Sequence, residues 1–298
     1  MFCWLVLVQV AFTIYNQNLL ILVVFWLFLT EWFLYGEVGV VIGGGRVIDE
    51  AMVKALVSDA QIAAERIGIP IKKLDDREIK NIVKSFNANF VVPFKERTIS
   101  DIYERHLVGI LVGAMAAKNQ MDAVIGGDMP ASNEISAPIP LEAAFLGIGD
   151  DWDDASPFTT GSPQNWVHSG TTYLGGTAGN DVKIGENAVH VIIGFGSLHP
   201  SPKISRLILR LNGKDKPTIS TGWIMRFGDL HIKEFSTDII LIKDSTFKAQ
   251  VMISSAFGSS VEDIPYFLGV SYISGNVLRT YADPANIKST DAKIISTT

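Results

Sequence analysis

Apolar and polar residues follow three different patterns along the 298-residue chain. Residues 1–36 are apolar with few interruptions, residues 37–128 repeat apolar positions every three to four residues, and residues 161–298 alternate in short segments. Periods of about 3.6 and 2 residues indicate helices and strands, respectively. We therefore expect an apolar N-terminal helix over 1–36, a helical region over 37–128, a connector over 129–160, and a β-domain over 161–298 that ends in a polar tail.

The N-terminal segment is long and apolar enough to span a bilayer. Leu19–Leu29 contains no charged residue, Glu31 is the only charge in the first 35 residues, and the first basic residue is Arg46. A helix needs about 20 apolar residues to cross the hydrocarbon core, and basic residues gather on the inner side. We expect one transmembrane helix with the body in the cytoplasm or virion interior. A buried helix that joins copies is the alternative, and Asn16–Asn18 leaves a short apolar hairpin open.

Two amphipathic helices open the helical region. Residues 47–67 place apolar side chains at helical spacing, and Gly68 predicts the end of this helix. Residues 76–87 repeat the pattern, with Asp75 as the expected N-cap because its carboxylate can accept a first-turn backbone N–H. The apolar segment 89–94 that follows predicts a short strand.

A third helix is expected over 101–124, with Ser100 as its N-cap. Its middle, "LVGILVGAMAA", is apolar on all sides, which predicts a buried helix. Glycines four residues apart in this stretch let two backbones approach closely. We therefore assign assembly contacts between copies to four residues of this helix: Leu107, Gly109, Leu111 and Gly113.

Short alternating segments separated by turns fill the β-domain. "ISRLILRL" (204–211) and "FKAQVMIS" (247–254) place alternate apolar residues on one face. Asn212–Gly213 and Gly275–Asn276 predict hairpin turns, because these residue types tolerate positive φ. About eight strands at this spacing predict a β-sandwich or jelly roll, so the fold class is mainly β with preceding helices.

Composition excludes several function classes. The formal charge is −6, and charged residues make up 19% of the chain against 48% hydrophobic residues. Direct nucleic-acid binding needs clustered Lys and Arg, so we do not expect it. The single cysteine, Cys3, rules out an internal disulfide and a cysteine-based zinc site. So apolar a chain is expected to bury an unusual share of itself, to sit in a membrane or to pack against copies of itself.

Three consecutive glycines are the strongest candidate for chemistry. Gly43–Gly45 follow an apolar run and precede a helix, as in anion sites. With Asp49 and Ala51 they resemble the glycine-rich loop of iron-type alcohol and glycerol dehydrogenases, which implies a nucleotide-dependent enzyme. The resemblance stops after this loop, and the spaced glycines of dinucleotide folds are absent. We interpret the glycines as a flexible joint and expect no cofactor, with the nucleotide enzyme as an alternative.

Other patterns of catalysis or metal binding are missing from the sequence. The acidic loop 150–154 lacks the glycine and glutamate positions of an EF-hand. The five histidines are not spaced as metal ligands, and no Gly-x-Ser-x-Gly elbow occurs. We therefore expect neither a metal site nor an enzyme.

The order of segments resembles that of viral jelly-roll capsid proteins. The resemblance is architectural, covers about residues 155–285 and includes no signature motif. It implies a self-assembling capsid protein in the virion, with copies of itself as partners and lipid contact through residues 1–35. An α/β capsid fold with a spine helix at 101–124 stays open. A membrane-anchored, glycan-binding β-sandwich is a further alternative, with four candidate aromatic residues on loops: Trp152, Trp166, Tyr173 and Trp223.

Overall fold

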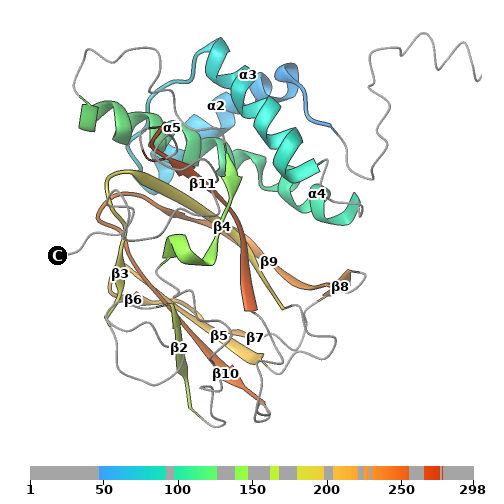
Figure 1. Ribbon diagram of the computed structural model, residues 1–298, viewed down its shortest axis with the longest axis vertical. Coiled ribbons are helices and arrows are strands. Elements are labelled where there is room, and N and C mark those ends of the chain that lie inside the picture. The colour runs from blue at the N-terminus through green and yellow to red at the C-terminus, as the bar shows by residue number, and fades with distance from the viewer. Residues whose placement is uncertain are drawn as a thin grey trace, which may run out of the picture. The chain divides into compact units, whose positions relative to one another are not determined.

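The helices and strands of the protein form adjacent layers (Figure 1). The computed structural model describes residues 47–91, 97–125, 138–146, 162–167, 180–197, 204–220, 225–227, 230–254, 265–275 and 277. The chain divides at Gly43, and the first unit, Met1–Ile42, lies outside the described residues together with the predicted N-terminal helix. Among the helices that the structure describes, none has the length and hydropathy needed to cross a membrane.

The first two helices form where the sequence predicts them. Asp49 caps the first helix by accepting the N–H of Met52 at 2.7 Å, and Gly68 ends it at a φ of 71°. Asp75 and Glu78 form a capping box at the second helix. The helical elements of this layer are α2 (Glu50–Ile67), α3 (Asp76–Phe86), the π-helical turn η1 (Asn87–Val91), α4 (Arg97–Arg105) and α5 (Leu107–Ile125).

Two predictions for this layer are wrong. The segment predicted as a strand over 89–94 begins as the π-helical turn η1, in which Phe90 packs against Tyr103 with ring centroids 4.6 Å apart. This tertiary contact outweighs the local preference for a strand. The helix predicted over 101–124 consists of α4 and α5, which meet at His106. Because α4 already begins at Arg97, Ser100 lies inside the helix and is not its N-cap.

The β-strands pair in two antiparallel sheets, which confirms the predicted antiparallel β-region. Sheet A has the strand order β1-β11-β4-β9-β8. Sheet B has the order β2-β10-β5-β6, with β3 on β10 and β7 on β5. The strands are β1 (Ile139–Pro140), β2 (Gln164–Val167), β3 (Val182–Lys183), β4 (Ala188–Ser197), β5 (Ile204–Leu211), β6 (Lys214–Asp215), β7 (Ile219–Ser220), β8 (Met225–Phe227), β9 (Leu230–Leu241), β10 (Thr246–Ile253) and β11 (Pro265–Ile273).

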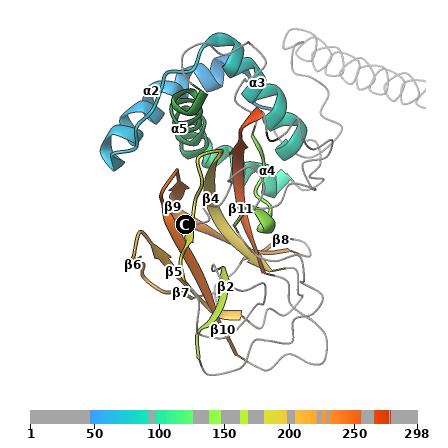
Figure 2. The ribbon, with the colours of Figure 1, turned by 60° about the vertical axis from the view of Figure 1, so that its left-hand side comes forward.

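One set of strand pairs is nested along the chain, and two further ladders, β4–β11 and β5–β10, join these pairs within each sheet. β1 pairs with β11, β2 with β10, β4 with β9, and β5 with β6 and β7. Successive pairs, taken from the outside inward, lie in sheets A, B, A and B. The long strands of the chain therefore alternate between the two sheets, as Figure 2 allows the reader to follow.

The predicted turns and the predicted connector can be compared with the structure. The turn at Asn212–Gly213 is confirmed by φ values of 51° and 72°. Gly275 is helical, and the N–H of Val277 donates to the carbonyl oxygen of Ser274 at 2.9 Å. Asn276 lies outside the described residues, so the hairpin turn at Gly275–Asn276 stays a prediction. The predicted connector supplies strand β1 and the 3₁₀ helix η2 (Ala143–Leu146). Ser85 of α3 fixes the start of β1 by donating to the carbonyl of Pro138 at 2.9 Å.

Sheet A has an apolar core on each face. Val189, Val191 and Ile193 of β4 pack with the helices, whereas Ile192 and Phe195 pack against sheet B. Odd-numbered residues of β4 face the helices up to Ile193, whereas Phe195 faces sheet B. This change of face occurs where the register between β4 and β9 shifts. Because both faces are buried, β4 is a nearly continuous apolar run rather than an alternating one.

Candidate functional site

Helix α5 lies on sheet A, and this interface contains the four residues that the sequence analysis assigned to assembly. Leu107 and Leu111 are 1% and 0% exposed. A Cβ atom added to Gly109 would lie 1.7 Å from an Asp238 carboxylate oxygen, and one added to Gly113 would lie 2.4 Å from Val191 Cγ2. The glycines therefore admit the sheet of the same chain, and the structure places all four residues inside the fold.

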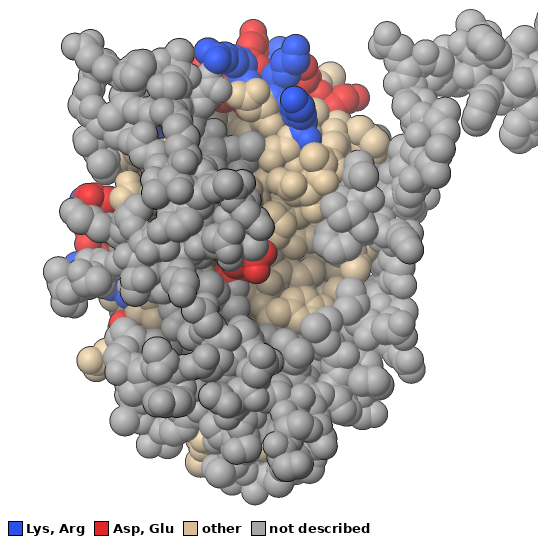
Figure 3. Space-filling model, viewed as in Figure 1, with Lys and Arg blue, Asp and Glu red and all other residues tan. Residues whose placement is uncertain are grey.

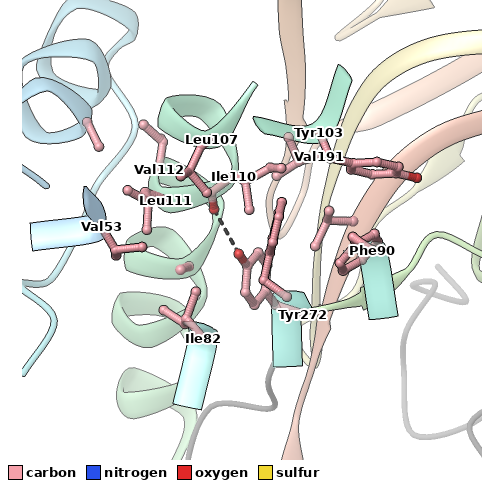
Figure 4. Close-up of a cluster of buried hydrophobic side chains, with 14 of the residues drawn as sticks. Val53, Ile82, Phe90, Tyr103, Leu107, Ile110, Leu111, Val112, Val191 and Tyr272 are labelled. Atoms are coloured by element: carbon pink, nitrogen blue, oxygen red, sulfur yellow. Dashed lines mark hydrogen bonds between the residues drawn. The ribbon is translucent and has the colours of Figure 1, made fainter. Parts of the chain in front are cut away.

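A tyrosine of sheet A fastens the middle of α5. The buried Tyr272 hydroxyl donates to the carbonyl oxygen of Ile110 at 2.8 Å (Figure 4). Its ring lies beside Gly113, where a Cβ atom would come within 3.1 Å of Tyr272 Cε2. Burial raises the pKa of Tyr272, so this hydroxyl stays protonated and keeps its donor. The contact fixes the distance between α5 and β11.

Gln120 fastens the other end of α5 to two loops of the β-domain. Its amide nitrogen donates to the carbonyl oxygens of Glu186 and Ala188 at 2.8 and 3.0 Å. Its amide oxygen accepts the backbone N–H of Lys243 at 2.8 Å. One side chain thus satisfies backbone groups that flank β4 and follow β9.

We expect Gln120→Ala to lower the free energy of unfolding by about 1–3 kcal/mol, because backbone partners of the amide lose their hydrogen bonds. Urea denaturation followed by circular dichroism measures this change. Asn119→Ala is the matched control, because the half-buried Asn119 next to it makes no such contact with the described residues, and we expect a change within about 0.5 kcal/mol. Equal losses in the two variants would contradict the role assigned to Gln120.

A cluster of charged side chains lies where α4 meets α5, on strand β9. His106 Nδ1 is 2.5 Å from Asp238 Oδ1, and His106 Nε2 is 3.0 Å from Glu234 Oε1. Arg105 binds Glu234 through two hydrogen bonds, Nε to Oε1 at 2.9 Å and Nη2 to Oε2 at 2.6 Å. We call these four residues the His106 cluster.

The geometry of the cluster requires a protonated imidazole. Each ring nitrogen of His106 faces a carboxylate oxygen, and a carboxylate only accepts hydrogen bonds, so both nitrogens must donate. Burial by itself lowers the pKa of His106, but the hydrogen bonds and charges of Asp238 and Glu234 outweigh it and raise the pKa above 6.5. The hydrogen bond from Arg105 lowers the pKa of Glu234.

This arrangement supports structure rather than catalysis. A general base needs a ring nitrogen free to take a proton, and both nitrogens of His106 are occupied. Asp238 and Glu234 lie on opposite edges of the ring, so the three side chains do not converge on one ion. Within the described part of the chain, no group of three or more His, Cys, Asp or Glu side chains is placed to hold a metal.

A bulge in β9 presents the two carboxylates of the cluster. Ile192 of β4 pairs with Ile239 and Gly194 pairs with Glu234, so residues 235–238 of β9 oppose a single residue of β4. Such bulges change the direction of nearby side chains. The carboxylates lie 128 and 132 residues after His106, so no short-range spacing in the sequence indicates the cluster.

A shallow groove of about 500 Å³ lies next to the cluster. Its apolar lining comes from Met52 and Leu56 of α2 and Leu107 and Val108 of α5, and its polar lining comes from Asp101, Glu104 and Arg105 of α4. Among the described residues, no Ser, Cys or His side chain lines it. The groove has an apolar floor and a charged rim without a reactive group.

The other sequence candidates either serve the fold or lie outside the described residues. Asp49, part of the dehydrogenase-like loop, is the N-cap of α2, while Gly43–Gly45 and the acidic loop 150–154 are not described. The glycan-binding alternative places Trp166 on an exposed loop, but this side chain is only 1% exposed and lies in strand β2. The remaining aromatic candidates lie outside the described residues: Trp152, Tyr173 and Trp223.

The described charges on the face shown in Figure 3 do not separate by sign. Lys, Arg, Asp and Glu side chains lie next to one another over the helices at the top of this view, and the described surface below them is mostly uncharged. The described residues on this face therefore show no separate basic patch of the kind that binds nucleic acid.

Comparisons with known proteins add little to these observations. No protein-family model matches the chain, and no curated protein is similar to it. A solved structure with some similarity is the insecticidal delta-endotoxin Cry8Ea1 from Bacillus thuringiensis, at 18% sequence identity and a TM-score of 0.21. The match covers 49% of this chain and 25% of the toxin, and a TM-score this low carries no argument about fold or function.

Proposed function

We propose that the protein is a structural, self-assembling shell protein of a virion, a capsid protein whose β-domain is a jelly roll. The observation that carries the proposal is the nested pairing of strands, in which successive pairs alternate between two antiparallel sheets. A long antiparallel ribbon that is rolled up produces this order, which is the topology of a double-sheet jelly roll. Fold alone does not establish function, so the composition and the site must agree with the proposal.

The site and the composition both support a structural role. Tyr272 and Gln120 hold the layers together at the helix–sheet interface, and the side chains of the His106 cluster pair with one another. The chain is 48% hydrophobic and only 19% charged, which suits a protein that also buries surface against copies of itself. We propose copies of the chain as the main partner, with lipid contact through residues 1–35, no direct nucleic-acid contact and no cofactor.

We expect the purified full chain to form particles of uniform size, visible by negative-stain electron microscopy and as one fast boundary in sedimentation velocity. Trp166→Ala serves as the control, because it removes a side chain from the sandwich core without changing the apolar N-terminal segment. Particles that disappear in this variant depend on the folded β-domain. A monomer in the wild type, or irregular aggregates that persist in Trp166→Ala, would contradict the shell proposal.

A further inference from the structure

We propose that His106 is a pH-sensitive latch between the helical layer and sheet A. In its protonated form the ring bridges Asp238 and Glu234 and holds the junction of α4 and α5 on β9. When the ring loses its proton, one of these two hydrogen bonds loses its donor and the junction is released. The latch is a property of the fold of a single chain, so it does not depend on the proposed shell function.

The charges around His106 balance only when the ring is protonated. Arg105 and His106 on the helical side then face Glu234 and Asp238 on β9, with two positive and two negative charges. In a neutral ring one nitrogen carries a proton and the other does not. Asp238, whose side chain is only 16% exposed, would then face either a bare nitrogen, which cannot donate, or an uncharged N–H. A half-buried carboxylate without a cationic partner is costly.

Charged groups on the neighbouring elements do not replace the imidazolium. On α4, Asp101 and Glu104 act on Arg105 and add negative charge to this side. Lys54 of α2 binds Asp76, and Lys118, at the far end of α5, binds Glu78 at 2.6 Å. Strand β4 carries no titratable group except His190, and burial lowers the pKa of His190 to about 3.

Local structure allows this junction to open without unfolding the sandwich. At His106, where α4 meets α5, the backbone N–H lies 3.3 Å from the carbonyl oxygen of Ile102, and the facing residues 235–238 of β9 form a bulge in the ladder with β4. The bulge leaves β9 with fewer ladder hydrogen bonds at this point. Tyr272 and Gln120 hold α5 further along the helix, so they can retain it while the His106 end moves away.

Linkage sets the direction of the pH dependence. The pKa of His106 is raised in the folded protein. The stabilisation of the fold by this ring is therefore fully present below pH 6.5, the usual pKa of histidine, and is lost as the pH rises through the folded-state pKa. The pKa of Glu234 is lowered in the folded protein. The stabilisation of the fold by this carboxylate is therefore present above pH 4.5, the usual pKa of glutamate, and is lost as the pH falls through its folded-state pKa. The latch is therefore closed in mildly acidic solution and opens toward alkaline pH.

Hydrogen exchange with mass spectrometry on the full chain, at several values between about pH 6 and about pH 9, tests the latch. After correction for the chemical exchange rate, we expect peptides from α4, the start of α5 and β9 to lose protection with rising pH. Protection of these peptides should fall by up to about tenfold per pH unit between the pKa of His106 in the unfolded chain and its pKa in the folded protein. Peptides from β5 and β10 should keep their protection.

His106→Gln should remove the pH step and leave the junction open at every pH. Lys54→Gln, which breaks an ion pair in the same layer, should retain the step. A step that persists in His106→Gln, or a uniform loss of protection over the whole wild-type chain, would overturn the proposal. If His106→Gln does not fold, the NMR titration of the His106 ring in the wild type decides the question. The ring and the amides of the junction must then shift with the same apparent pKa, and a junction unaffected by ring titration overturns the latch.

Discussion

Gly113→Leu is expected to lower the free energy of unfolding by about 3 kcal/mol, at the upper end of the cost of overpacking. A Cβ atom alone would lie 2.4 Å from Val191 Cγ2 and 3.1 Å from Tyr272 Cε2, and leucine adds three further carbon atoms. The helix cannot move away without breaking the hydrogen bond from the Tyr272 hydroxyl to the Ile110 carbonyl. Urea denaturation measured by far- and near-ultraviolet circular dichroism gives the change.

Ala55→Leu is the matched control, because it adds the three carbon atoms beyond Cβ at an exposed position of α2. We expect its stability to remain within about 0.5 kcal/mol of the wild type. Sedimentation separates the internal role of Gly113 from a contact between copies. A Gly113→Leu variant with wild-type stability that fails to form particles would show that the contact lies between copies, against the packing described above.

Trp166→Ala is expected to cost about 3–5 kcal/mol of stability, which is the usual range for removing a large aromatic side chain from a core. The ring of Trp166 stacks on Phe267 at 4.4 Å and meets Phe195 edge-on at 5.5 Å between ring centroids. It therefore bridges β2 of sheet B with β4 and β11 of sheet A. Thermal unfolding followed in the near ultraviolet reports on this core directly.

Two further variants sharpen this test. Trp166→Phe should cost less than Trp166→Ala, because Trp166 Nε1 is buried and has no hydrogen-bond partner among the described residues. Ile208→Ala, on the opposite face of β5 from Leu207 and Leu209, should cost about 1 kcal/mol or less. A Trp166→Ala variant that is as stable as the wild type but loses binding on a glycan array would revive the glycan-binding alternative.

The sequence predicted those elements that nearby residues determine. Gly68 ends α2 and Asp75 caps α3, because a cap or a left-handed residue acts within one helical turn. Asn212–Gly213 forms its turn for the same local reason. The alternation in 247–254 identified the buried face of β10 correctly, because a strand that is buried on one face has a period of two residues.

Only the tertiary structure determined how these elements combine. Which strand pairs with which is settled by contacts far apart in the chain, and the period of a strand carries no information about its partner. His106 gained its role from carboxylates more than 120 residues away. Trp166 and Gly113 fit either a core or an interface equally well in the sequence, because apolar side chains and small residues pack the same way in both. The fold placed both residues in the core, since sheet A of the same chain already supplies the close-packed partner of each.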